Sequence, residues 1–137
     1  MKKTYLIFGF EKSGQSALEL IYNKKDLFYI YDENENIKIT AQEKAKHFLN
    51  VFVISNLEKK LLKNVSTIIL SPGVSVYHWA IKYAKRNKVE VISELELGFR
   101  FVKYSKIFIF LLFSNSNFSF KALLPFFIAS SIFTSIF

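Results

Sequence analysis

Thr4-Tyr-Leu-Ile-Phe-Gly-Phe-Glu-Lys-Ser-Gly-Gln-Ser16 is the stretch that decides the fold. Residues 4–8 form an unbroken run of β-branched, aromatic and aliphatic side chains, which predicts a buried strand. Gly9 ends this run, and residues 17–21 then predict a helix. A strand that passes through a glycine turn into a helix directs several backbone N–H groups at one spot, where the helix dipole also favours an anion. The stretch therefore predicts either a phosphate-binding turn or only the tight turn that every doubly wound fold needs.

The glycine turn and the acidic residue after the next strand match parts of a dinucleotide-binding pattern. The full fingerprint is G-x-G-x-x-G; Gly9 and Gly14 fill its ends, but Glu11 occupies the place of the middle glycine. A second predicted strand, residues 27–31, ends at Asp32. A carboxylate about 20 residues after the glycine turn meets ribose hydroxyls in nucleotide-binding βαβ units. We therefore predict a ligand contact for Asp32, with a plain acidic turn as the alternative.

Composition limits the classes of protein to consider. The chain has 137 residues, enough for one ordinary domain with an appendage. It has no cysteine, which excludes disulfides and thiolate metal sites, and its two histidines have no metal-ligand spacing. The net charge is +8, but lysines alternate with acids, as in Glu43-Lys-Ala-Lys46, so solvated helix faces are predicted and no nucleic-acid partner. Met1-Lys2-Lys3 leads straight into a strand without a cleavage site, so we expect no signal peptide and a cytoplasmic protein.

Strand and helix patterns alternate up to about residue 101. Three further apolar runs predict strands at residues 51–54, 67–70 and 89–92. The second helix is expected over Thr40–Leu49, with Thr40 as its cap and Glu43 completing a capping box. Because the strands are apolar on both faces, we predict a Rossmann-like α/β fold, with about five parallel strands and helices on both faces. Ligands of such sheets bind at the carboxyl ends of the strands, and one ligand can touch the turns at residues 9–14, 32–36 and 71–73.

Three segments in this order carry a resemblance to a known family: Gly9-Phe-Glu-Lys-Ser-Gly-Gln-Ser16, Ile69-Leu-Ser-Pro-Gly-Val74 and Val91-Ile-Ser-Glu-Leu-Glu-Leu97. Together they resemble the N-terminal domain of the Mur ligases of peptidoglycan synthesis, and within that family the D-glutamate-adding branch, the MurD ligases. The second and third segments are the more specific. The resemblance covers residues 3 to about 105, and it implies a Rossmann-like UDP-binding domain over residues 1–105, followed by an apolar tail over residues 106–137.

The resemblance also implies a partner and a binding site. In the family this domain holds the UDP part of UDP-N-acetylmuramoyl-L-alanine. Lys12 and Ser13 would then lie beside the uracil and diphosphate, with the Ser13 hydroxyl and nearby amides as donors. Asp32 and Glu33 would lie near the uridine, and Ser71-Pro72-Gly73 would form a wall against the base. The full set of implied UDP-binding residues is Lys12, Ser13, Gly14, Asp32, Glu33, Ser71, Pro72 and Gly73. Glu11 departs from the family pattern by placing a carboxylate close to the diphosphate, and Trp79 stands where the family often has proline.

The segment after residue 105 differs from what the family implies. In the family, the next strand runs into an ATP loop of the form T-G-[TS]-N-G-K-[ST]. This chain has no glycine after Gly98. We therefore expect a truncated ligase without the ATP-binding and D-glutamate domains, which binds neither ATP nor Mg²⁺ and is inactive by itself. Residues 107–137 carry one charge, Lys121, and nine phenylalanines. They predict an out-of-frame or unstructured, aggregation-prone tail, with a membrane anchor or hairpin as the alternative.

Two functions of different classes follow from these patterns. The first is a truncated D-glutamate-adding ligase that retains the UDP-binding domain. The second is a non-enzymatic nucleotide-binding module that the apolar tail tethers to a membrane. A dehydrogenase is disfavoured because the middle glycine of the fingerprint is absent.

Overall fold

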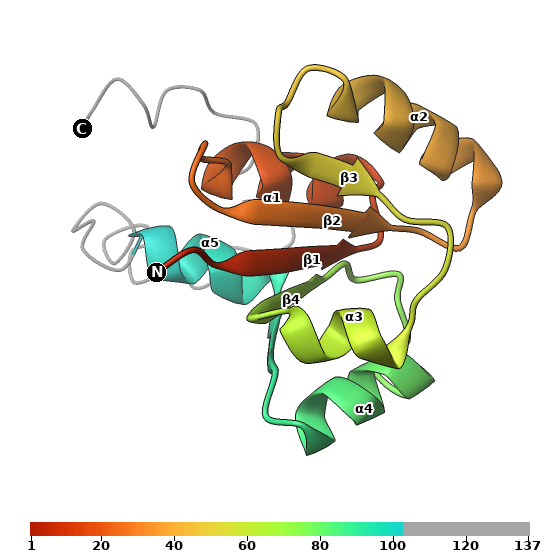
Figure 1. Cartoon of the computed structure of the whole chain (residues 1–137), viewed down its shortest axis with the longest axis vertical. Coiled ribbons are helices and arrows are strands. Elements are labelled where there is room, and N and C mark those ends of the chain that lie inside the picture. The colour runs from red at the N-terminus through yellow and green to blue at the C-terminus, as the bar shows by residue number, and fades with distance from the viewer. Residues whose placement is uncertain (103–137) are drawn as a thin grey trace, which may run out of the picture. The chain divides into compact units, whose positions relative to one another are not determined.

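One parallel sheet forms the centre of the fold (Figure 1). The computed structural model describes residues 1–102; the predicted tail, residues 106–137, lies outside this part of the chain. The sheet has five strands in the order β3-β2-β1-β4-β5. Their bounds are Thr4–Phe8 for β1, Leu27–Tyr31 for β2, Val51–Val53 for β3, Thr67–Leu70 for β4 and Glu90–Ser93 for β5. This architecture confirms the predicted Rossmann-like α/β fold.

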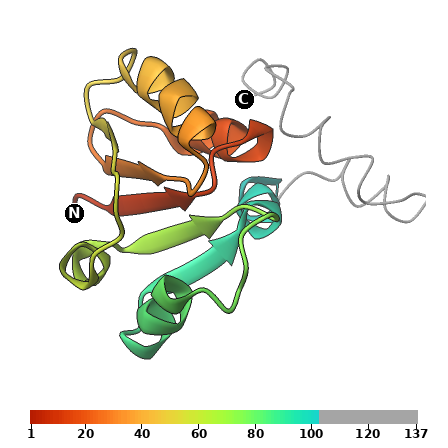
Figure 2. The same cartoon turned by 90° about the vertical axis from the view of Figure 1, so that its right-hand side faces the viewer.

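Helices cover both faces of the sheet. They are α1 (Lys12–Ile21), α2 (Glu35–Ala45), α3 (Lys59–Asn64) and α4 (Trp79–Arg86); a fifth helix, α5 (Glu94–Val102), follows β5 in the chain. Figures 1 and 2 show α1 and α2 together on one face of the sheet, and α3 and α4 together on the other. The sheet and its first four helices belong to one compact unit, Met1–Glu94, and a second unit begins at Leu95. No helix in the described part of the chain is long and apolar enough to cross a membrane.

The central strand β1 is buried on both faces, as its unbroken apolar run predicts. Leu6 and Phe8 pack on the face covered by α3 and α4, in a cluster completed by Leu62, Val65, Ile68, Leu70, Ala80, Ile81 and Ala84. Ile7 points to the other face and is also fully buried. The parallel register places Phe8 opposite Tyr31 of β2 and Leu70 of β4. The turn that follows β1 therefore lies between the turns that follow its two neighbours.

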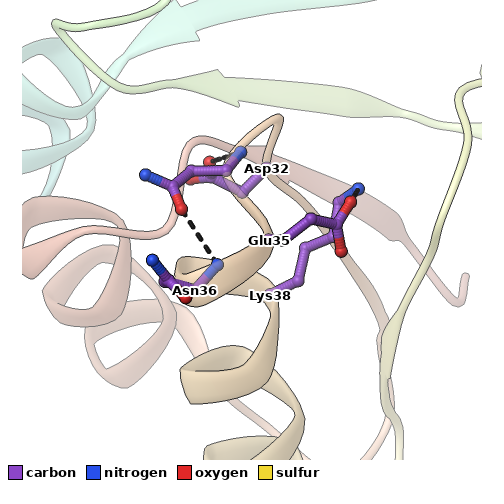
Figure 3. Close-up of polar contacts among 5 residues, drawn as sticks. Asp32, Glu35, Asn36 and Lys38 are labelled. Carbon is purple, nitrogen blue, oxygen red and sulfur yellow. Dashed lines mark hydrogen bonds and ion pairs between the residues drawn. The ribbon is translucent and has the colours of Figure 1, made fainter.

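The predicted start of the second helix was wrong. α2 begins at Glu35, and its cap is Asn34, whose side chain accepts a hydrogen bond from the Asn36 N–H at 2.9 Å (Figure 3). Thr40 lies inside the helix, where its hydroxyl donates to the Asn36 carbonyl at 3.2 Å. Asparagine and threonine both cap helices, so local chemistry favoured neither position. The short turn after β2 decided it, because the helix starts as soon as the chain leaves the sheet.

Candidate functional site

The candidate site lies where the strand order of the sheet reverses. From β1 the chain proceeds through β2 to β3 on one side, whereas β4 and β5 lie on the other side of β1. The turns after β1 and β4 therefore lead away from each other at the carboxyl edge of the sheet. Ligands of open α/β sheets bind at such a switch point. The predicted turns at residues 9–14, 32–36 and 71–73 all leave this edge.

Hydrogen bonds join the turn after β1 to both neighbouring strands. The Gly9 N–H donates to the Tyr31 carbonyl at 2.8 Å, and the Ser71 N–H donates to the Phe8 carbonyl at 3.0 Å. The Ser71 hydroxyl reaches the Gly9 carbonyl at 2.9 Å. Gly9 has a φ of 91°, and a Cβ there would lie 2.6 Å from the Cβ of Ser71. Only glycine fits this turn, because both the backbone angle and the nearby serine exclude a side chain.

The first turn of α1 is available to an anion. The helix starts at Lys12, and Glu11 at its N-cap makes no side-chain capping bond. First-turn N–H groups that lack a capping side chain attract anions, and the helix dipole adds to this attraction. Lys12 is exposed and Ser13 is half-buried. Gly14 is buried because it packs against the turn: a Cβ there would lie 2.1 Å from the Gly9 carbonyl oxygen. Gly14 thus brings the start of α1 against the turn.

The carboxylate of Asp32, at the end of β2, is hydrogen-bonded to the turn after β1. One carboxylate oxygen accepts the Phe10 N–H at 2.7 Å, and the other accepts the Asn34 N–H at 2.8 Å. Figure 3 shows Asp32 beside the start of α2, where Glu35 and Lys38 form an ion pair at 2.6 Å. A carboxylate has about four acceptor positions, so these two bonds leave Asp32 able to accept from a ligand hydroxyl. Asp32 can therefore both hold the turn, as the alternative interpretation has it, and contact a ligand, as we predicted.

Glu33 and His78 connect the turn after β2 with the turn after β4. Their side chains approach to 3.3 Å between His78 Nε2 and Glu33 Oε1. His78 Nδ1 accepts the Ala80 N–H at 3.2 Å and so caps α4, while its ring packs edge-on against Phe8 at 5.0 Å between centroids. Because Nδ1 accepts, Nε2 is the ring nitrogen that carries a hydrogen, and it faces Glu33. Sequence reasoning gave His78 no role, because it considered the two histidines only as metal ligands.

Glu94 is a buried acid of the site that sequence reasoning also missed. It is 4% exposed, and its Oε1 is hydrogen-bonded with the Ser71 hydroxyl. Burial raises the pKa of Glu94, and the hydroxyls of Ser71 and Ser13 act in the opposite direction. The residue stood within the quoted segment Val91–Leu97, but nothing in the segment indicated that its side chain points inward. An acid directly after an apolar strand is more often exposed.

The structure brings most of the predicted site residues to one edge of the sheet. Ser71 is buried, whereas Pro72 and Gly73 are exposed. The turns that contain Asp32 and Ser71 are both hydrogen-bonded to the turn that contains Gly9. Ser13 faces Glu94, and Glu33 is held by His78. Within residues 1–102, no three His, Asp or Glu side chains are grouped to hold a metal ion. The arrangement offers backbone amides, hydroxyls and one lysine, which suit an anion with hydroxyl-bearing neighbours.

Comparison with known proteins gives a consistent picture. The model of the Mur ligase MurD-like N-terminal domain matches residues 3–93. The UDP-N-acetylmuramoylalanine–D-glutamate ligase of Aquifex aeolicus is 30% identical over 99 residues, which are 72% of this chain and 20% of the relative. The ligase of the same name from a Thermoanaerobacter species is 30% identical over 102 residues, 74% of this chain and 22% of the relative. The ligase of the same name from a Hydrogenobaculum species is 31% identical over 103 residues, which are 75% of this chain and 21% of the relative.

The chain spans about a fifth of the length of these relatives. Among solved structures, a shikimate 5-dehydrogenase-like protein aligns with a TM-score of 0.46 and 14% identity, over 93% of this chain and 55% of that one.

Proposed function

This chain belongs to the MurD-like N-terminal domain family of the Mur ligases, and on that premise we propose that it binds the UDP moiety of UDP-N-acetylmuramoyl-L-alanine. The matched relatives are named as ligases of this substrate and D-glutamate. The proposal concerns binding of the nucleotide end and assigns no ligation step, ATP or Mg²⁺ to residues 1–102. Our other expectation, a membrane-tethered nucleotide module, rests on residues outside the described part, and no comparison favours it.

One observation carries the proposal: the turns after β2, β1 and β4 are hydrogen-bonded into a single surface. Asp32 accepts from Phe10 at 2.7 Å, and the Ser71 hydroxyl reaches Gly9 at 2.9 Å. A nucleoside diphosphate has an anionic group, a ribose and a flat base in sequence. Three adjoining turns at one edge of the sheet can contact all three parts of one ligand.

Six of the predicted residues have a distinct part in this proposal. The first-turn amides of α1 and the Lys12 ammonium bind the diphosphate, because both place positive charge at the same helix end. Asp32 accepts from ribose hydroxyls while holding the turn. Pro72 and Gly73, which are exposed, contact the base, and Ser71 before them is fixed by its hydrogen bond to Gly9. Glu33 lies beside the ribose, and its contact with His78 holds it there.

Titration of the full chain with UDP tests the proposal. We expect saturable binding at millimolar or lower UDP, followed by amide chemical shifts, with the largest changes at residues 9–14, 32–34 and 71–73. ADP carries the same diphosphate and is the ligand control for base selectivity. Lys12→Ala should weaken UDP binding roughly two- to fivefold, as loss of a screened charge contact of about 0.5–1 kcal/mol predicts. Lys24→Ala, an exposed lysine in the turn before β2, is the matched control.

The outcomes separate the proposal from its competitors. Absence of heat and of shift changes at millimolar UDP would overturn it. Equal binding of ADP and UDP would indicate a general diphosphate site and contradict the assignment of the turn after β4 to the base. An equal loss in Lys12→Ala and Lys24→Ala would show that net charge, and not the helix end, attracts the ligand.

A further inference from the structure

Glu94 combines a buried carboxyl with an incomplete set of hydrogen bonds. Its side chain is 4% exposed and lies at the start of α5, directly after β5. Oε1 is bonded with the Ser71 hydroxyl, whereas Oε2 has no hydrogen-bond partner within residues 1–102. An ionised carboxylate here would be a buried charge that faces, among the described residues, only the hydroxyls of Ser71 and Ser13. A neutral acid is less costly in such surroundings, because burial penalises the charged form.

The hydrogen bonds of Ser71 indicate where the proton lies. Its hydroxyl oxygen is within bonding distance of both the Gly9 carbonyl, at 2.9 Å, and Glu94 Oε1. A serine hydroxyl carries a single hydrogen, and a carbonyl can only accept. Ser71 therefore donates to Gly9, and the contact between Ser71 and Glu94 needs a hydrogen from Glu94. Both contacts are satisfied together only when Glu94 is protonated.

We propose that Glu94 is a positioning residue of the nucleotide site, whose protonated carboxyl donates to Ser71 and so keeps the Ser71 hydroxyl on the Gly9 carbonyl. This inference rests on the proposed UDP-binding function. Ionisation reverses the arrangement: Glu94 accepts the Ser71 hydrogen, and the Gly9 carbonyl loses its donor. A negative charge then lies beside the turns that bind the diphosphate. The proton on Glu94 thus couples the join between β1 and β4 to anion binding.

The neighbours of Glu94 define the sign of its pH dependence. The groups that face it are the hydroxyls of Ser71, from the turn after β4, and Ser13, from α1; no charged side chain within residues 1–102 contributes to the shift of its pKa. On its own helix, Glu96 pairs with Arg100 at 2.6 Å. Burial raises the pKa of Glu94 above its ordinary value of 4.5. Its contribution to stability is therefore complete below that value and is lost as pH rises through the raised pKa.

By linkage, ligand binding and proton binding strengthen each other. A UDP-sugar should bind the wild-type chain more weakly as pH rises, severalfold overall and at most about tenfold per pH unit, the limit for one linked proton. A UDP-sugar is the suitable probe because its diphosphate is esterified at both ends. The terminal phosphate of UDP itself titrates at about pH 6 and would add its own pH dependence.

Glu94→Gln is the decisive variant, because its amide donates to Ser71 and cannot ionise. We would measure affinity for UDP-N-acetylglucosamine, and the urea midpoint without ligand, from about pH 5 to about pH 8.5 with the full chain. Both quantities should fall with rising pH in the wild type and stay nearly constant in Glu94→Gln. Glu96→Gln removes an exposed carboxylate from the same helix and should follow the wild type. Calorimetry of the wild type in two buffers of different ionisation enthalpy should show proton uptake on binding.

The urea midpoints test the proton without any ligand, so the two proposals fail separately. A flat wild-type profile, or parallel profiles for wild type and Glu94→Gln, would overturn the assignment to Glu94. Different midpoint profiles without UDP-sugar binding at any pH would overturn the proposed function and, with it, the role of Glu94 in that site. If Glu94→Gln fails to fold, the wild-type calorimetry decides: binding without proton uptake contradicts the inference.

Discussion

At the scale of single residues, Gly14 shows how the absence of a side chain shapes the site. It sits inside α1, where alanine would normally be the better helix former. A Cβ at this position would, however, lie 2.1 Å from the Gly9 carbonyl oxygen. The close approach brings the positive end of α1 against the turn after β1. In the glycine pattern, this position therefore serves helix–strand packing.

Gly14→Ala should destabilise the fold by about 1–3 kcal/mol, because the methyl group has to displace backbone. The measurement is urea unfolding followed by circular dichroism. Gly98→Ala is the matched control, since Gly98 also lies within a helix but a Cβ there meets nothing within 4 Å. It should be neutral or stabilise by up to about 1 kcal/mol through helix propensity. Equal effects of the two substitutions would contradict the packing role of Gly14.

At the scale of elements, the start of α2 depends on its cap. Asn34→Ala removes the side chain that accepts the Asn36 N–H at 2.9 Å and should cost about 1 kcal/mol of unfolding free energy. Thr40→Ala lies within the same helix and should be neutral or slightly stabilising, because alanine has the higher helix propensity. Urea midpoints of the two variants measure the difference. A larger loss in Thr40→Ala would place the cap where the sequence pattern predicted it.

His78 joins two elements, since it caps α4 and contacts the turn after β2. His78→Ala should cost about 1–2 kcal/mol, from the lost cap and the lost ring contact with Phe8. Trp79→Ala next to it removes a 45%-exposed side chain and should cost less. A double-mutant cycle of His78→Ala with Glu33→Gln should give a small but measurable coupling of up to about 1 kcal/mol, as expected for an exposed partner. No coupling at all would show that the two turns are joined by other contacts.

At the scale of the whole molecule, Asp26 and Glu94 should give stability opposite dependences on pH. The pKa of Asp26 is lowered, first by the Lys3 N–H that donates to it at 2.8 Å and then by the Asn23 amide. Its contribution is present above the ordinary value of 3.8 and is lost as pH falls through the lowered pKa. Glu94 contributes at low pH and loses its contribution on the alkaline side.

Asp26→Asn should therefore flatten the acid limb of the stability profile. Between about pH 6 and about pH 2.5, the urea midpoint of the wild type should fall more than that of Asp26→Asn. Glu58→Gln, an exposed acid at the N-cap of α3 with no capping bond, is the control and should follow the wild type. Parallel profiles for wild type and Asp26→Asn would show that other carboxylates set the acid limit.

The sequence by itself determined the order of the elements and the turns that carry the site. Strands β1, β2 and β4 have the predicted bounds, because continuous apolar runs ended by Gly9, Asp32 and Ser71 leave little choice locally. The three predicted ligand-binding turns followed from that order, since parallel strands bring their carboxyl ends to one edge. That the ligand is UDP was implied by the resemblance to the Mur ligases. The contacts of these residues with a nucleotide stay predictions.

Only the tertiary structure decided what each polar side chain of the site does. The choice of Asn34 over Thr40 as a cap, the contact of Glu33 with His78 and the burial of Glu94 against Ser71 all join or orient segments that local propensity treats alike. Ser71 and Glu94 are 23 positions apart in the chain. Their meeting depends on which strands are neighbours in the sheet. Burial and hydrogen-bond partners are properties of the packed chain, so the sequence pattern could not supply them.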